Sequence, residues 1–288
     1  METVMETSTP ATPVDQYVDV KGVTTRYWTG GDAGSPVVLI HGLGGYVEAW
    51  LPSLGALATE HRVYALDLIG CGRTAKPSGA SYDLATLSQF VRDFMTATEI
   101  ECAHVVGHSL GGAIATRLAL GNPGAVDRLV LVASAGMGRE VHVMLRLMRV
   151  PIVGGLLTRP SRSGSAKVLK LMVDDESLMD DKIEHDYQMT SLPGAQKALL
   201  KILRECWKSL ASQVKGTDGP DLRGLATSAN AVLVIWGRQD RVLPVANAEV
   251  AAQKVPNATV KLIDHCGHLP MFEHPQEFNA LLLDFLRD

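Results

Sequence analysis

Six short apolar runs constrain the fold of this chain more than any other feature. They are rich in Val, Leu and Ile and lack polar alternation, which is typical of parallel strands buried on both faces. The runs are PVVLIHG, HRVYALDL, AHVVGHS, RLVLVAS, AVLVIWG and TVKLID. Helical patterns separate several of them, including DLATLSQFVRDFMTATEI with Asp83 as candidate N-cap, and PQEFNALLLDFLRD closes the chain. This alternation predicts an α/β fold with a mostly parallel, doubly wound sheet.

The alternation stops between about Met137 and Leu225, where only helical patterns occur. We therefore expect a helical cap over residues 137–225, inserted into a sheet domain made of residues 16–136 and 226–288. QYVDVKGVTTRYW alternates polar and apolar residues, which predicts a hairpin at the sheet edge. Residues 1–15 are expected to be a disordered leader.

Composition excludes several classes of function. Hydrophobic residues make up 46% of the 288 residues and charged residues 20%, typical of a soluble globular protein. The formal net charge of -4 argues against nucleic acid as a partner, because binding to phosphates needs a basic face. No apolar run reaches the length of a membrane span, and the N-terminus lacks the apolar segment of a secretory signal.

The cysteines indicate free thiols rather than disulfides or a metal site. Cys71, Cys102, Cys206 and Cys266 are scattered, without C-x-x-C or zinc-type spacing. Free thiols are typical of a reducing compartment, so we expect a cytoplasmic protein. The sequence implies no metal and no organic cofactor.

VVGHSLGG contains a serine, Ser109, at Gly-x-Ser-x-Gly spacing between a predicted strand and a predicted helix. In a sharp strand-to-helix turn the residues two before and two after the serine crowd each other, and Gly107 and Gly111 satisfy that constraint. A serine hydroxyl is a poor nucleophile at neutral pH, so it needs a base within hydrogen-bond reach and a carboxylate to orient that base.

Both partners occur in strand-end loops, in the order nucleophile, acid, base. VLVIWGRQDRVLP places Asp240 after one strand, and LIDHCGHLPMFEHP places His268 after the next. Catalytic groups in α/β sheets gather at the carboxyl ends of the strands, so the three residues can converge into a triad. His265 and His274 compete with His268 for the role of base, and we expect them to be packing or surface groups.

LIHGLGG is a strand followed by a glycine-rich turn that can present a backbone N–H. We expect the oxyanion hole to use the N–H groups of Leu43 and Leu110, with Gly44 as an alternative to Leu43.

Four further residues near these motifs have structural explanations that we favour. We expect His41 to hydrogen-bond the oxyanion turn and His108 to point away from the pocket into the core. Asp67 is expected to organise a loop, although it is an alternative acid. Cys71 lacks a base in its sequence context and is expected to be inert.

Four stretches together resemble the α/β-hydrolase family from Pro36 to Asp288: HGLGG, GHSLGG, WGRQDRVLP and CGHLPMFEHP. LKLMVDDESLMDDKIEHDYQM, IWGRQDRVLP and DHCGHLPMFEHPQEFNALLLDFL are also similar to the meta-cleavage-product hydrolases, which split C–C bonds in vinylogous diketones. That subgroup usually has Asn-Ser-Met at the nucleophile, an aromatic residue after the catalytic histidine, and a cap arginine for the substrate carboxylate. This chain has His108-Ser109-Leu110, Leu269 and no arginine near Asp186.

These departures favour an ester hydrolase, so we expect a small-molecule carboxylic ester as substrate and a reaction through an acyl-enzyme. C–C bond hydrolysis and a ligand-binding receptor that retains the triad are the alternatives. A homodimer is possible. The expected substrate-contacting residues, chosen to form an apolar acyl or aryl pocket, are Gly44, Met137, Met144, Leu147, Val242 and Leu269.

Arg139, Arg146 and Arg149 lie among apolar cap residues. One hypothesis is a basic amphipathic face that touches a lipid surface. We favour instead a lid helix with snorkelling arginines, and so expect no membrane contact.

Overall fold

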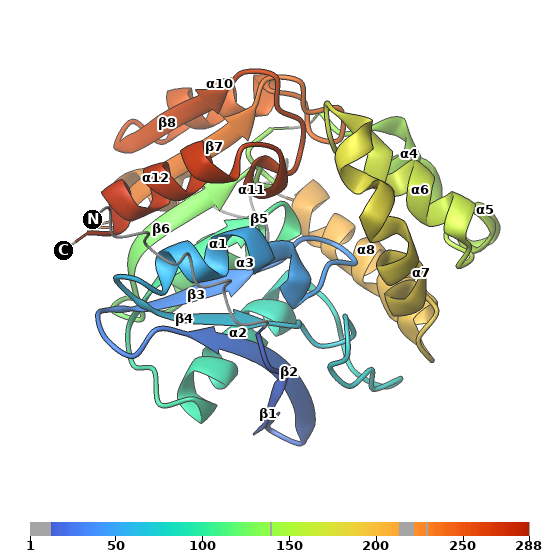
Figure 1. Ribbon diagram of the computed structural model, residues 1–288, viewed down its shortest axis with the longest axis horizontal. Coiled ribbons are helices and arrows are strands. Elements are labelled where there is room, and N and C mark those ends of the chain that lie inside the picture. Colours follow the sequence, from blue (N-terminus) through green and yellow to red (C-terminus); the bar gives the residue numbers. More distant parts are fainter. Residues whose placement is uncertain (1–12, 139, 213–221, 229, 288) are drawn as a thin grey trace, which may run out of the picture.

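An eight-stranded sheet forms the centre of the molecule (Figure 1). The computed structural model describes residues 13–138, 140–212, 222–228 and 230–287. The strand order is β1-β2-β4-β3-β5-β6-β7-β8; β1 and β2 pair antiparallel, as do β2 and β4, and every other pair is parallel. The strands are β1 (Gln16–Val20), β2 (Val23–Gly30), β3 (Pro36–Ile40), β4 (Arg62–Leu66), β5 (Ala103–His108), β6 (Val126–Val132), β7 (Ala231–Gly237) and β8 (Ala258–Ile263).

Burial of the strands follows their place in the sheet. All six residues of β5 are buried, as is β7 from Val232 onward, because both strands have neighbours on each side and helices on each face. The predicted edge hairpin is present as β1 and β2, with Lys21 and Gly22 at positive φ in its turn. The prediction for TVKLID was wrong in one respect: β8 alternates between exposed and partly buried residues, because it is the other edge strand.

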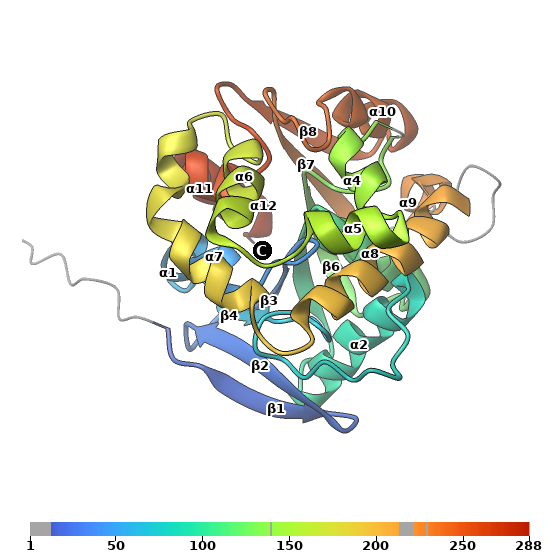
Figure 2. The ribbon, with the colours of Figure 1, turned by 90° about the vertical axis from the view of Figure 1, so that its right-hand side faces the viewer.

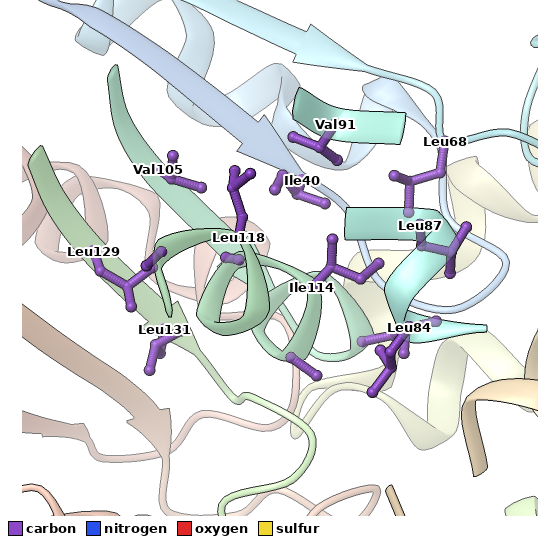
Figure 3. Packing of buried hydrophobic residues seen from close by; sticks show 14 of the residues in the cluster. Ile40, Leu68, Leu84, Leu87, Val91, Val105, Ile114, Leu118, Leu129 and Leu131 are labelled. Atoms are coloured by element: carbon purple, nitrogen blue, oxygen red, sulfur yellow. The ribbon is translucent and has the colours of Figure 1, made fainter. Parts of the chain in front are cut away.

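Helices cover both faces of the sheet, each over its own apolar cluster. On one face are α2 (Leu84–Ala97), α3 (Leu110–Gly121), α9 (Leu222–Thr227) and α10 (Ala246–Lys254). Asp83 caps α2 by accepting a hydrogen bond from the Thr86 N–H. Figure 3 shows leucine, isoleucine and valine side chains of this cluster interdigitating between α2, α3 and the strands. On the other face are α1 (Leu51–Leu57), α11 (Pro270–Glu273) and α12 (Pro275–Leu286), with the short helix η1 (Val47–Trp50). The predicted α/β fold, mostly parallel and doubly wound, is confirmed.

The helices between β6 and α9 lie beyond the carboxyl ends of the strands, and Figure 2 views them from outside. We call α4 to α8 the cap: α4 (Val143–Met148), α5 (Pro151–Leu157), α6 (Arg162–Leu171), η2 (Glu176–Lys182), α7 (Ile183–Thr190) and α8 (Ala195–Ser212). Helix α9, by contrast, packs beside the sheet against α3 and α10. Most of the expected leader, and Arg139, fall outside the described residues. Among the described residues, no helix combines the length and the apolar character that crossing a bilayer requires.

Candidate active site

Ser109 stands alone between the end of β5 and the start of α3. Its φ of 52° lies in the left-handed region, which is sterically costly for a residue with a side chain. The glycines two residues away make this turn possible: a Cβ on Gly107 would collide with the Gly111 backbone, and a Cβ on Gly111 would collide with the carbonyl of Ile40. The turn therefore has the strained geometry that exposes a serine hydroxyl at the end of a sheet.

Asp240 and His268 meet in the loops that follow β7 and β8. The Nδ1–H of His268 donates to Asp240 Oδ2 at 2.7 Å, and both side chains are buried. The other oxygen, Oδ1, accepts the N–H groups of Val242 at 2.8 Å and Leu243 at 2.9 Å. With Nδ1 bound in this way, Nε2 is the nitrogen that can take a proton from a substrate-side group.

Ser109 and His268 line the same pocket, which we call the cap pocket because cap helices close it. The structure thus brings the three predicted residues to one place, although no hydrogen bond joins Ser109 Oγ to His268 within the described residues. Catalytic hydrogen bonds are often longer without substrate than in the reacting complex. The catalytic roles of the three residues stay a prediction.

Glu273 braces the histidine loop, and sequence reasoning missed it. Its Oε1 accepts the Gly267 N–H at 2.8 Å and the Leu269 N–H at 3.3 Å, on either side of His268. Its Oε2 accepts the N–H of Asp174, in the cap, at 2.6 Å. The stretch CGHLPMFEHP contains this glutamate, but its spacing from the histidine does not indicate which backbone groups it binds.

The cap is also fastened to both loops through its backbone. The His268 N–H donates to the Met172 carbonyl at 2.6 Å. The guanidinium of Arg241, next to Asp240, donates to the carbonyls of Lys170 at 2.8 Å and Val173 at 2.7 Å. The end of α6 therefore fixes two loops together: the loop after β7, which carries Asp240, and the loop after β8, which carries His268.

The predicted oxyanion turn lies at the pocket wall. Leu43 and Gly44 line the pocket, Gly44 has a φ of 69°, and the Gly45 N–H donates to the Gly42 carbonyl at 3.1 Å. Leu110 is buried at the start of α3, directly after Ser109, and is not among the lining residues. The choice of Leu43 and Leu110 as oxyanion donors stays a prediction.

His41 supports this turn from below, as predicted. Its Nδ1–H donates to the Gly42 carbonyl at 2.7 Å, and its Nε2 accepts the Leu68 N–H at 3.0 Å. Full burial lowers the pKa of His41 to about 4, so the ring is neutral and can accept and donate at once.

His108 differs from its prediction. The residue is buried but belongs to the pocket lining instead of pointing away from it. Its Nε2–H donates to the backbone carbonyl of His268 at 2.9 Å, and the two rings lie 4.7 Å apart. Burial lowers the pKa of His108 well below the usual value. His108 therefore holds the loop that carries His268, and His268 stays the predicted base.

Asp67 organises a loop, as predicted. It accepts the N–H groups of Val47 and Arg73, each at 2.7 Å, and burial raises its pKa to about 6. Cys71 lies in the pocket wall, where burial raises the pKa of its thiol to about 12, consistent with an unreactive group. His265 is exposed, and its carbonyl binds His274 Nε2 at 2.8 Å, away from the triad.

The cap pocket has a volume of about 250 Å³ and a mostly apolar wall. Of the predicted substrate contacts, Gly44, Met144, Val242 and Leu269 line it. Met137 and Leu147 do not, which corrects their prediction. Met137 is buried in the core cluster beside the sheet, and Leu147 is 46% exposed because it lies on the outer side of α4.

The described pocket lining contains one arginine and one aspartate: Arg159, which is exposed, and Asp186. Asp186 accepts a hydrogen bond from the Tyr46 hydroxyl at 3.2 Å, and burial raises its pKa. The pocket lining in the described part of the chain therefore contains a partly buried carboxyl group and no buried lysine or arginine. Within the described ranges, no three His, Cys, Asp or Glu side chains gather in a way that could hold a metal ion.

Comparisons with known proteins agree with this geometry. A family model described as alpha/beta hydrolase fold matches residues 35–275. The chain is 37% identical over 268 residues to the dihydrolipoyllysine-residue acetyltransferase component of the acetoin cleaving system of Cupriavidus necator, covering 93% of this chain and 67% of that protein. It is 32% identical over 278 residues to the 2-hydroxy-6-oxo-6-(2'-aminophenyl)hexa-2,4-dienoic acid hydrolase of Metapseudomonas resinovorans, covering 95% of this chain and 91% of that protein.

Among solved structures, a meta-cleavage product hydrolase of Pseudomonas fluorescens superposes with a TM-score of 0.81. It is 28% identical in sequence, and the match covers 94% of this chain and 96% of that chain. The resemblance to α/β-hydrolases and to meta-cleavage-product hydrolases is thus confirmed. Neither of these hydrolases is named for ester cleavage, so the comparisons favour the C–C alternative over our primary expectation.

Proposed function

Because the chain belongs to the α/β-hydrolase family, we propose that it is a serine hydrolase of the meta-cleavage type, acting on a C–C bond next to a carbonyl group. The observation that carries the catalytic part is the Asp240–His268 hydrogen bond of 2.7 Å beside the strained Ser109 turn in one pocket. The choice of bond is supported by the relatives of that type, whose matches span nearly the whole chain.

In the proposed reaction Ser109 Oγ adds to the carbonyl carbon while His268 Nε2 takes its proton. The N–H groups of Leu43 and Leu110 stabilise the oxyanion. The C–C bond then breaks, its electron pair moves into the departing conjugated fragment, and His268 returns the proton to that fragment. Water, activated by the same imidazole, hydrolyses the acyl-enzyme to the acid and frees Ser109.

Ester hydrolysis is the second candidate, and Asp186 is the observation that favours it. A ring-fission dienoate carries a carboxylate, which gains from a cationic partner inside an apolar pocket. This pocket instead holds the partly buried carboxyl group of Asp186 next to Tyr46, while its lining arginine, Arg159, is exposed. An uncharged ester meets no such repulsion, and the same triad can cleave it.

A direct comparison of a ring-fission dienoate with a p-nitrophenyl ester tests the choice of bond. The C–C proposal predicts a higher kcat/KM for the dienoate; fast ester cleavage with slow dienoate loss would replace it by the ester candidate. The Asp186→Asn variant should raise kcat/KM for the dienoate about tenfold, because it removes a carboxyl group that disfavours a second carboxylate in the pocket, and should leave an uncharged ester nearly unchanged. Glu184→Gln, on the exposed side of the same helix, is the matched control.

Labelling with a fluorophosphonate tests the catalytic part separately. The proposal predicts labelling of the native chain and none of Ser109→Ala. A native chain that is not labelled and that turns over neither substrate would instead agree with a ligand-binding protein that retains the triad.

A further inference from the structure

The outer side of α4 and α5 exposes an unusual number of apolar side chains. Of the twelve large apolar side chains that are exposed in the described part of the chain, seven lie between residues 143 and 157. We call them the α4–α5 face: Val143, Leu147, Val150, Ile152, Val153, Leu156 and Leu157. Ile152 is 79% exposed and Leu156 is 71% exposed. Soluble proteins rarely cluster such side chains in water unless the patch binds something.

Helix α5 exposes its large apolar side chains, whereas an amphipathic surface helix usually buries them. Its buried residue is Gly154, which packs against the Met148 carbonyl and the side chain of Leu200 in α8. Polar groups of α8 hold its backbone: Gln196 donates to the Gly155 carbonyl at 2.8 Å, and Arg204 donates to the Pro151 carbonyl at 3.4 Å. The large apolar side chains of α5 therefore contribute little to its attachment and remain available on the outside.

The helix also lies at the outer limit of the cap. It forms the far end of the molecule in Figure 1 and faces the viewer in Figure 2. The α4–α5 face is thus accessible to a broad, flat surface.

The charges within the segment that carries this face have one sign. Between residues 141 and 173 the sequence contains six lysines and arginines and no aspartate or glutamate, although the whole chain has a net charge of -4. Arg162 and Lys170 form ion pairs with Glu184 and Asp180. In contrast, the exposed side chains of Arg146, Arg159 and Lys167 have no ion pair among the described residues. An apolar patch flanked by unpaired cations matches the interface of an anionic bilayer, where apolar groups enter the acyl boundary and cations remain at the headgroups.

The face is continuous with the cap pocket. Leu157 and Arg159 belong both to the exposed rim and to the pocket wall, and Met144 and Met148 line the pocket from α4. In place of the expectation of no membrane contact drawn from the sequence, we propose that the α4–α5 face binds the surface of an anionic lipid bilayer. This places the pocket mouth at the acyl boundary, where apolar substrates partition. The proposal holds for either bond considered above.

Flotation with lipid vesicles tests this proposal. The native chain should bind vesicles of phosphatidylcholine and phosphatidylglycerol in equal parts at least about tenfold more tightly than phosphatidylcholine alone, and added salt should reduce the difference. The double variant Ile152→Ser/Leu156→Ser should lose about tenfold or more of that binding, because two apolar anchors are removed. Tyr17→Ser/Leu51→Ser, which removes two exposed apolar side chains outside the cap, is the matched control.

Three results would overturn the proposal. The first is no flotation with either vesicle. The second is flotation that the cap variant leaves undiminished. The third is a native dimer in analytical ultracentrifugation that Ile152→Ser/Leu156→Ser converts to a monomer, which would show that a second copy covers the face. Because neither residue lines the pocket, an unchanged melting temperature and unchanged turnover of a soluble substrate verify that the variant is folded.

Discussion

Two sides of the cap pocket are built in opposite ways. On the sheet side, Ser109 and Asp240 follow the buried strands β5 and β7, and His268 follows the edge strand β8. The loops are held by buried hydrogen bonds such as His268 to Asp240 at 2.7 Å. On the cap side, α5 turns a glycine inward and its large apolar side chains outward. The first arrangement fixes reacting groups, which chemistry at a serine requires. The second is poorly explained by the stability of the isolated chain and better explained by contact with something outside it.

The largest expected effect concerns the predicted nucleophile, and it tests whether the sheet side is the reactive side. Ser109→Ala should lower kcat/KM about 10⁴- to 10⁶-fold, because the remaining groups cannot form an acyl-enzyme. Ser88→Ala, at a buried serine of α2, serves as control and should leave the rate nearly unchanged. If Ser109→Ala retains most of the activity on a substrate that the native chain turns over, the assignment of the sheet side as the reactive side is wrong.

The sheet side should also be the acid-sensitive side, because burial there lowers the pKa values of His41 and His108. The pKa of His41 is lowered from 6.5 to about 4 by burial, so between these pH values the unfolded chain binds more protons than the folded one. The contribution to the free energy of unfolding is complete above pH 6.5 and lost as pH falls through about 4, a difference of about 3 kcal/mol.

Urea unfolding at several pH values measures this effect. His41→Gln should be less stable at neutral pH, because one side-chain amide cannot replace both hydrogen bonds of the ring, but its stability should fall less steeply with acid. His185→Gln, at a partly exposed histidine, is the matched control. A His41→Gln profile parallel to the native one would contradict the burial argument.

Glu273 links the two sides, so its removal tests how much the sheet side depends on the cap. Glu273→Ala leaves the N–H groups of Gly267 and Leu269 without their acceptor and should lower kcat about 10- to 100-fold by loosening His268. Glu273→Gln keeps an oxygen for Gly267 and should recover most of the rate. Glu277→Ala, at an exposed glutamate, is the control. An effect on KM alone would assign Glu273 to the pocket rather than to the histidine loop.

The sheet side was predictable from sequence because its residues are tied to strand ends. Non-alternating runs before Ser109 and Asp240 indicated buried strands, whose carboxyl ends must meet at one edge. The brace at Glu273 was not predictable, since it depends on which backbone N–H groups the folded loop presents. The orientation of α4 was not predictable either. Every residue of this short helix except Arg146 is apolar, so periodicity could not decide that Met144 faces the pocket and Leu147 the solvent.

The smallest expected effect is the change in the free energy of unfolding when apolar residues of the α4–α5 face are replaced. A small change would support the proposal that this face binds something outside the chain. Ile152→Ser/Leu156→Ser should change the free energy of unfolding by within about 0.5 kcal/mol per site, because both side chains are mostly exposed and α5 is held through Gly154 and its backbone. Leu39→Ala, at a fully buried residue of β3, should cost about 2 to 5 kcal/mol. Denaturant titration of both variants distinguishes the two regions. A large loss of stability in the cap variant would mean that these side chains pack against the protein in solution, whereas a negligible loss leaves their clustering to be explained by binding.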